Sequence, residues 1–190
     1  MSRSLHRARA LAVALVVSSP AAIAAQRRSV SEIEIGTFVG YTRLTQPGAS
    51  AVTSWGAPGG SINTSPALYL TVIGVRPQFI ELQAGYSKIS TDNSVAESLD
   101  LLGRVGWLSR PRAKASPYAA IEGAYEHLRA SSALGAPATI SGPAYGGALG
   151  YRVHVGRGAG VRFEAHYRVW KGDFDSLHEL GVGIGFCGIL

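Results

Sequence analysis

The chain has 190 residues, of which 46% are hydrophobic and 16% are charged, so its composition suits one folded domain and excludes a disordered segment. Its formal net charge is +6, but three arginines lie in the first 25 residues, and the rest of the chain carries 15 basic against 12 acidic residues. The remaining charge of +3 gives no reason to expect a nucleic-acid partner. The single cysteine, Cys187, excludes an intramolecular disulfide framework.

The N-terminus has the pattern of a cleaved signal peptide. Three arginines lie before a short apolar run, Ala10–Val17, and small residues follow Pro20. The alternative is an uncleaved membrane anchor, which the shortness of the run disfavours. We therefore expect residues 1–25 to direct export and residues 26–190 to form one mature domain.

Eight segments of the mature chain alternate as β-strands do, or are short apolar runs between turn residues. In chain order they are Ile33–Leu44, Leu68–Val75, Phe79–Ile89, Ser98–Leu108, Tyr118–Leu128, Ala144–Val155, Gly160–Val169 and Leu177–Ile189. Most are long enough to cross a bilayer as tilted strands, which takes about 9–11 residues. No amphipathic helix competes with this interpretation.

The connections between these segments tend to alternate in length. Residues 45–67, 90–97 and 129–143 are expected to form loops at one end of the strands, whereas residues 76–78 form a tight turn at the other. Long outer loops, short turns and an even number of strands are typical of outer-membrane β-barrels. Trp55, in the first loop, is an exposed candidate for partner contact, unless that loop has no function.

The stretch VRFEAHYRVW, residues 161–170, shows how the two strand faces differ. Val161, Phe163 and Ala165 alternate with charged residues such as Arg162 and Glu164. A soluble barrel would alternate too, but here the charged faces also carry many glycines, which weaken a water-exposed strand and make room inside a narrow eight-stranded lumen. The charged residues expected to face the lumen are Glu34, Glu81, Asp100, Arg104, Glu122, Glu126, Arg152, His154, Arg162, Glu164, His166, Arg168 and Glu179.

Aromatic residues gather near both ends of the apolar faces. Tyrosines lie at the strand ends that adjoin the long loops, and Trp107 and Phe186 lie toward the opposite ends. Two aromatic girdles that flank an apolar band are typical of membrane barrels, because Tyr and Trp prefer the interface between lipid and water. A soluble sandwich with chance core aromatics is the alternative. The predicted girdle residues are Tyr41, Tyr86, Trp107, Tyr125, Tyr145, Tyr167 and Phe186.

With these patterns, the chain resembles the OmpA-like family of small eight-stranded outer-membrane barrels. The segment GYRVHVGRGAGVRFEAHYRVW, residues 150–170, is similar to the closing hairpin of that family. The segment ELGVGIGF is similar to its C-terminal assembly signal, with Glu179, Gly181, Ile184 and Phe186 in the signal positions, although four residues follow here. The resemblance implies a monomeric, antiparallel, up-and-down transmembrane β-barrel in the outer membrane. It further implies contact with outer-membrane lipids, including lipopolysaccharide, and with the barrel-assembly machinery.

Charged residues of both signs in the predicted lumen favour a salt-bridge network that plugs it, since buried charges must be paired. We therefore expect a structural or surface-interaction role through the outer loops, without catalysis and without a cofactor or metal. One alternative is an enzyme that modifies membrane lipids, of the lipid A deacylase type. It would need a base and an acid such as His166 and Glu164, or Ser176 near His178. The other alternative is a narrow pore.

Overall fold

The structure is a computed structural model that describes residues 30–48, 50–56, 67–74, 76–91, 94–111, 113–132, 135–174 and 176–190. Residues 1–29 lie outside this set, so the signal peptide stays a prediction. The strands and the one 3₁₀ turn of the described residues are β1 (Val30–Thr45), β2 (Val52–Gly56), β3 (Ala67–Gly74), β4 (Gln78–Thr91), β5 (Ser94–Leu108), β6 (Ala115–Ser132), β7 (Gly135–His154), β8 (Ala159–Trp170), η1 (Gly172–Phe174) and β9 (His178–Ile189).

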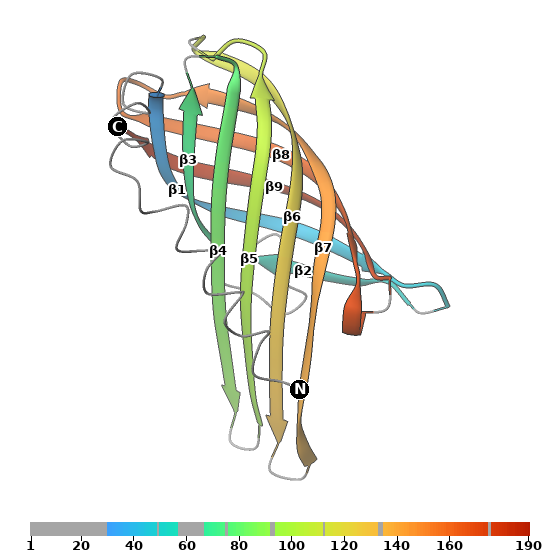
Figure 1. The fold of residues 1–190 in the computed structure, drawn as a ribbon. Coiled ribbons are helices and arrows are strands. Elements are labelled where there is room, and N and C mark those ends of the chain that lie inside the picture. The colour runs from blue at the N-terminus through green and yellow to red at the C-terminus, as the bar shows by residue number, and fades with distance from the viewer. Residues whose placement is uncertain are drawn as a thin grey trace, which may run out of the picture.

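Eight of the strands form a closed antiparallel barrel (Figure 1). From β3 to β9, each strand pairs with its neighbour in the sequence, and β1 pairs with β3 on one side and with β9 on the other. The last pairing runs from Glu34 opposite Ile189 to Thr45 opposite His178, and it closes the wall. All eight predicted segments are strands, so the predicted fold class of an eight-stranded up-and-down barrel is confirmed.

The strand β2 was not predicted, because it lies in the segment expected to be a loop. It pairs with β1 from Gly40 opposite Gly56 to Leu44 opposite Val52. The pairing of β1 with β3 stops at Phe38 opposite Ala67, so β2 occupies the edge of β1 beyond the start of β3. Trp55 thus lies in a strand opposite Tyr41 rather than in a loop.

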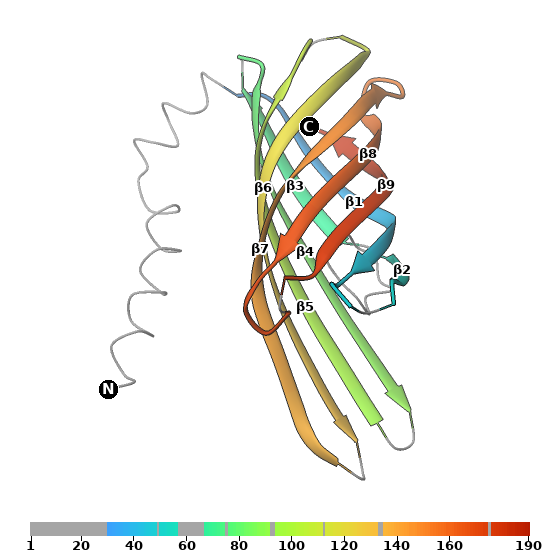
Figure 2. The ribbon, with the colours of Figure 1, turned by 90° about the vertical axis from the view of Figure 1, so that its right-hand side faces the viewer.

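Four strands, β4 to β7, continue past the rest of the barrel as a projecting sheet, which Figure 2 shows below the other strands. The expectation of loops at residues 90–97 and 129–143 is therefore wrong: β4 reaches Thr91, and β6 and β7 stay paired to Ser132 opposite Gly135. Gly, Pro and Ala suggested loops there. However, the pairing of β7 with β8 begins only at Ala144, so the preceding part of β7 has a free edge on that side. A free strand edge tolerates proline, because the missing N–H group is not needed for pairing.

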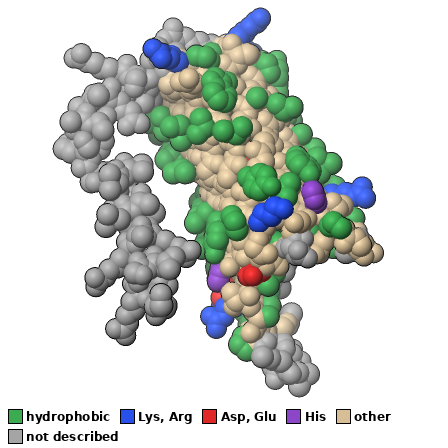
Figure 3. All heavy atoms as spheres, turned by 45° about the vertical axis from the view of Figure 1, so that its right-hand side comes forward, with side chains coloured by type: hydrophobic (Ala, Val, Ile, Leu, Met, Phe, Trp, Pro, Cys, Tyr) green, Lys and Arg blue, Asp and Glu red, His purple; other side chains and the backbone are tan. Residues whose placement is uncertain are grey.

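The outer wall of the barrel is apolar. Leu68, Ile121 and Leu149 are each about two-thirds exposed, at 67%, 65% and 68%. Figure 3 shows hydrophobic side chains spread over the wall, with charged side chains toward its two ends. Among the described residues no helix is long and apolar enough to cross a membrane. A closed barrel with such a wall satisfies its backbone hydrogen bonds internally and can bury its apolar face in lipid, so the fold is that of a transmembrane β-barrel.

Glycines on the inner face of the wall make room for large side chains. A Cβ atom at Gly150 of β7 would overlap with the ring of Tyr118, and one at Gly181 of β9 would overlap with the ring of His166. Sequence reasoning expected this space to serve Arg and Glu. The structure uses it mainly for rings, because planar rings can lie flat against a strand that has no side chain at that point.

Candidate functional site

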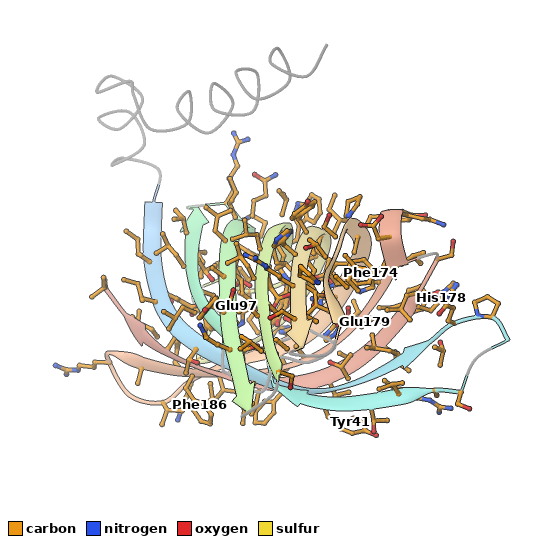
Figure 4. The ribbon with its side chains drawn as sticks, turned by 90° about the horizontal axis from the view of Figure 1, so that it is seen from below. Tyr41, Glu97, Phe174, His178, Glu179 and Phe186 are labelled. Carbon is orange, nitrogen blue, oxygen red and sulfur yellow. The ribbon has the colours of Figure 1, made fainter. Side chains whose placement is uncertain are left out.

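The candidate site is the interior of the barrel, because strand alternation directs one set of side chains into it. Of the thirteen charged residues expected to face the lumen, twelve are buried and His154 is half-buried. They come from β1, β4, β5, β6, β7, β8 and β9, and none comes from β3. Figure 4, seen along the barrel, shows Glu179 within the wall and Tyr41 and Phe186 outside it.

At mid-height, Arg104 of β5 holds three carboxylates from three strands. Its Nη1 and Nη2 donate to Glu164 of β8 at 2.7 and 2.6 Å. Its Nε donates to Glu122 of β6 at 2.7 Å, and Nη1 also contacts Glu81 of β4 at 3.1 Å. All three nitrogens of one guanidinium group thereby join opposite walls of the barrel, which fixes the geometry of the centre.

Arg162 of β8 occupies the next position toward the turn end of the barrel. It pairs with Glu81, and its Nη2 donates to the Tyr118 hydroxyl at 3.2 Å. Its guanidinium carbon lies 4.8 Å from the ring centre of Tyr69 and 5.1 Å from that of Tyr118. The Tyr118 hydroxyl donates to Glu164 at 2.6 Å. Cation–π contacts of this kind stabilise a guanidinium group that has lost its water.

Sequence reasoning missed the two tyrosines of this cluster. Tyr69 lies on β3, whose sequence is apolar on both faces. The alternation of this strand therefore did not show which of its faces lies inside the barrel. Tyr118 shares the inner parity of Glu122 and Glu126 on β6, and this parity was a usable signal. Both tyrosines are buried, at 2% and 5% exposure.

Toward the projecting end, Arg168 joins Glu122 at 2.6 Å and Glu179 at 3.0 Å. Glu179 also contacts His166 Nε2 at 2.9 Å and accepts a hydrogen bond of 2.6 Å from Trp170 Nε1. The Glu179 carboxylate therefore binds three side chains of the neighbouring strand β8. Glu179 is also the first residue of the segment that is similar to an assembly signal. In the folded barrel, this residue has a packing role as well.

An aromatic cap lies above this cluster. Trp170 is 1% exposed and packs against Phe174 of η1, with ring centres 5.3 Å apart. The connection that carries Phe174 is held in place because Asp173 accepts a hydrogen bond of 2.8 Å from the backbone N–H of Ser141. Asp173 is thus used in a contact that fixes this connection.

At the turn end of the barrel, Arg152 pairs with Glu32 and Glu34, and His154 Nε2 lies 3.3 Å from Glu32. Glu32, Glu34 and His154 lie close enough together to share a metal ion. Yet the guanidinium group of Arg152 contacts both carboxylates, so a positive charge already lies beside each of them. This group is best explained as an ion-pair network, like the rest of the lumen.

These side chains leave little open space at the turn end of the lumen. The cavity bounded by Thr71, Phe79, Tyr118, Arg162 and their neighbours has a volume of about 10 Å³, which is room for one water molecule at most. A buried apolar cluster lies beside it, formed by Ile73, Phe79, Leu108, Tyr118 and Ala120. Among the described residues, the lumen is therefore filled at its turn end.

The residue pairs considered for catalysis are engaged elsewhere. The Ser176 hydroxyl accepts a hydrogen bond of 3.0 Å from Lys171, and His178 Nδ1 lies 2.6 Å from the Tyr167 hydroxyl. His166 and Glu164 are buried inside the barrel, away from the lipid that such an enzyme would modify. Neither pair is arranged as a nucleophile with its base.

The aromatic residues expected in the girdles lie on the outer wall. Tyr41 is half-buried, and the other six are between 44% and 58% exposed. Tyr86 lies opposite Leu99, and Tyr125 lies opposite Leu101, near the level at which the projecting sheet leaves the barrel. Trp107 lies at the other end, opposite Gln78.

No protein-family model matches the sequence, and no curated protein matches it. Solved structures do match the fold. Neisserial surface protein A has a TM-score of 0.61 at 7% identity, covering 82% of this chain and 96% of that one. The attachment invasion locus protein Ail of Yersinia pestis has a TM-score of 0.56 at 12% identity, covering 84% and 98%. Ail in complex with the heparin analogue sucrose octasulfate has a TM-score of 0.57 at 10% identity, covering 84% and 98%. The chain therefore has the fold of the small outer-membrane β-barrels, as its resemblance to the OmpA-like family implied.

Proposed function

We propose that this protein is a surface-interaction protein whose projecting sheet binds partners outside the cell. The observation that carries the proposal is the continuation of β4 to β7 beyond the tyrosine girdle. From Tyr125 to Ser132, strand β6 extends by a length of roughly 20 Å at about 3.3 Å per residue. A filled barrel needs no such extension for its own stability.

The projecting sheet offers an open edge. β4 pairs with β3 only as far as Ala84 opposite Leu68, whereas its pairing with β5 continues to Thr91 opposite Ser94. The edge from Gly85 to Thr91 is therefore unpaired among the described strands, and extended peptides bind such edges by adding a strand. Lys88 lies on this segment, and a lysine on an edge strand disfavours pairing between identical copies.

The outer face of the same sheet is polar. Lys88 forms an ion pair of 2.9 Å with Glu97, and Arg129 lies opposite Glu97 on β6. Sulfated saccharides are a reasonable first probe for a face with exposed basic residues, because the structurally similar Ail was solved with sucrose octasulfate. Phosphate groups of lipopolysaccharide are expected to meet the same level of the wall.

The other predicted partners and the monomeric state belong to this proposal. The closure between β1 and β9 leaves no barrel edge for a second copy, which supports a monomer. The segment from Glu179 to Phe186 forms the closing strand, as expected of a segment that the assembly machinery recognises. The filled interior and the engaged residues Ser176 and His178 disfavour the pore and the lipid-modifying enzyme.

Two deletions test the proposal without disturbing the barrel. Ser87 lies opposite Ser98, so replacing residues 88–97 by Asn-Gly joins the two with a tight hairpin turn. Leu128 lies opposite Ile140, so residues 129–139 can be replaced in the same way.

Cells displaying each form are tested for adhesion to immobilised extracellular proteins and sulfated saccharides. We expect the full chain to adhere and the shortened chains to lose adhesion while they still fold. Equal adhesion of full-length and shortened forms, or no adhesion above cells that lack the protein, would contradict the proposal.

A further inference from the structure

Two neighbouring connections at the turn end of the barrel carry exposed basic residues. Arg76 lies between β3 and β4, and Arg110 and Lys114 lie between β5 and β6. All three residues are exposed. Figure 3 shows Lys and Arg side chains at this end of the molecule, which is the upper end in the view. We call Arg76, Arg110 and Lys114 the basic patch.

The positive charge of the basic patch is not balanced by nearby carboxylates. Residues 75–77 and 109–114, which form the two connections, contain no Asp or Glu. None of the three basic residues forms an ion pair with another residue that the structure describes. The carboxylates of Glu32 and Glu34, at the same end, already pair with Arg152 inside the barrel. The two connections therefore present a positively charged surface.

Backbone hydrogen bonds hold the two connections against the wall of the barrel. The Pro77 carbonyl, next to Arg76, accepts a hydrogen bond of 2.7 Å from the N–H group of Leu108 at the end of β5, so the two connections lie side by side. The Lys114 carbonyl accepts a hydrogen bond of 2.7 Å from β7, and the Arg110 carbonyl accepts one of 3.0 Å within its own loop. The backbone positions of the three cations are thus fixed before any ligand binds, which lowers the entropy lost on binding.

Aromatic residues of the outer wall indicate the level of the lipid surface at this end. Trp107 and Phe186 are each about half exposed, and aromatic side chains such as Trp prefer the interface between lipid and water. Arg110 follows Trp107 by only three residues, which is at most about 10 Å along the chain. Charges act over about 10 Å in 0.1 M salt, so the basic patch lies within reach of lipid headgroups.

We propose that the basic patch binds the phosphate groups of anionic phospholipids in the periplasmic leaflet of the outer membrane. The turn end is expected to face the periplasm, as the short turns of such barrels do. Two of the three cations are arginines, whose planar guanidinium groups can bind two phosphate oxygens at once. Binding there gathers anionic lipids around the turn end and sets the depth of the barrel in the membrane. The patch lies at the end opposite to the projecting sheet, so it does not depend on the proposed surface function.

Fluorescence quenching measures which lipids lie next to the basic patch. In a Cys187→Ser background, Ser109→Cys places a fluorophore beside Arg110, and the labelled protein is folded into vesicles with equal amounts of phosphatidylglycerol and phosphatidylcholine. Bromine is carried by the anionic phosphatidylglycerol in one sample and by the uncharged phosphatidylcholine in the other. We expect at least about twofold stronger quenching by brominated phosphatidylglycerol, because each basic residue at an anionic surface strengthens the attraction roughly fivefold.

Matched variants assign this preference to the basic patch. Arg76→Gln combined with Arg110→Gln should reduce the preference for phosphatidylglycerol, and replacing all three residues of the patch by Gln should remove most of it. The control combines Arg43→Gln with Arg129→Gln, two exposed arginines toward the other end of the barrel, and should be quenched as the native chain is. In vesicles made only of brominated phosphatidylcholine, all variants should be quenched equally, which shows that each has folded to the same depth.

A measurement on the native chain alone covers the case in which a variant folds poorly. Raising the salt concentration from 0.01 M to 1 M shortens the screening length from about 30 Å to about 3 Å, so the preference of the native chain should largely disappear. Equal quenching by the two lipids at low salt overturns the proposal, and co-sedimentation with peptidoglycan in that case would assign the patch to the cell wall instead. A preference that persists in 1 M salt, or that is unchanged when all three residues are replaced, overturns it as well.

Discussion

Arg104 and Glu164 form a two-pronged ion pair across the barrel, with nitrogen–oxygen distances of 2.7 and 2.6 Å and no exposure of either side chain. They lie on β5 and β8, which are not neighbours in the wall. The pair therefore spans the lumen rather than linking adjacent strands. It is the clearest sign that the charged faces of the strands are turned inward.

Removing Arg104 should be strongly destabilising. Arg104→Ala leaves Glu81, Glu122 and Glu164 buried with less positive charge, and loss of one partner of a buried ion pair costs about 3–5 kcal/mol. The free energy of unfolding in lipid vesicles, measured by urea titration, checks this. The control Arg157→Ala removes an exposed arginine in the β7–β8 turn and should change little. An Arg104→Ala variant as stable as that control would show that the network contributes nothing.

Gly150 should be intolerant of a side chain. In Gly150→Ala the added methyl group overlaps with the Tyr118 ring, and overpacking of this kind costs about 1–3 kcal/mol. Gly123→Ala is the matched control, because the nearest atom to an added Cβ on that outer-face glycine is 3.9 Å away. The same urea titration compares the two. Equal stabilities would mean that the Tyr118 ring does not lie against β7.

The two ends of the barrel should differ in accessibility on intact cells. A protease-sensitive tag inserted between residues 132 and 135, at the tip of the projecting sheet, is expected to be cleaved from outside. The same tag at Arg157, in the short β7–β8 turn, is expected to be protected until the outer membrane is opened. Immunoblots of cells treated with protease distinguish the two. The reverse pattern would mean that the barrel is inserted in the opposite orientation.

The filled lumen should not conduct ions. Because the cavity beside Arg162 has a volume of only about 10 Å³, the protein in a planar bilayer is expected to give no resolved single-channel steps. A larger porin reconstituted in the same bilayer serves as the positive control. Regular conductance steps from the purified protein would support a narrow pore instead.

Strand parity was the part of this molecule that the sequence could predict best. Successive side chains of a strand point to opposite faces, so once one residue is assigned to a face, every other residue of that strand is assigned too. The positions of Ala165 and His166 therefore followed from a single choice of face. The choice was possible because charged residues and glycines share one face. On β3 the rule gave no answer, since both faces are apolar, and the inward position of Tyr69 was missed.

Contacts across the barrel could not be predicted in the same way. Whether Arg104 reaches Glu164 depends on the register of every strand between β5 and β8, and no local pattern shows the register. The opposition of Asp100 and Glu126 has the same origin. The projecting sheet was missed for another reason. Its glycines, prolines and alanines are typical of loops, but the pairing of strands begun in the barrel continues through them.

Two neighbouring residues test the central claim, that the apolar face meets lipid and the charged face fills the lumen. Ala165 is exposed on the wall of β8, and His166 is 2% exposed inside it. In a Cys187→Ser background, Ala165→Cys and His166→Cys are each labelled with a fluorophore, and the protein is folded into vesicles that contain brominated lipid. We expect strong quenching of the label at position 165 and little at position 166. Quenching at position 166 with none at position 165 would contradict the assignment of the two faces and, with it, the charged lumen.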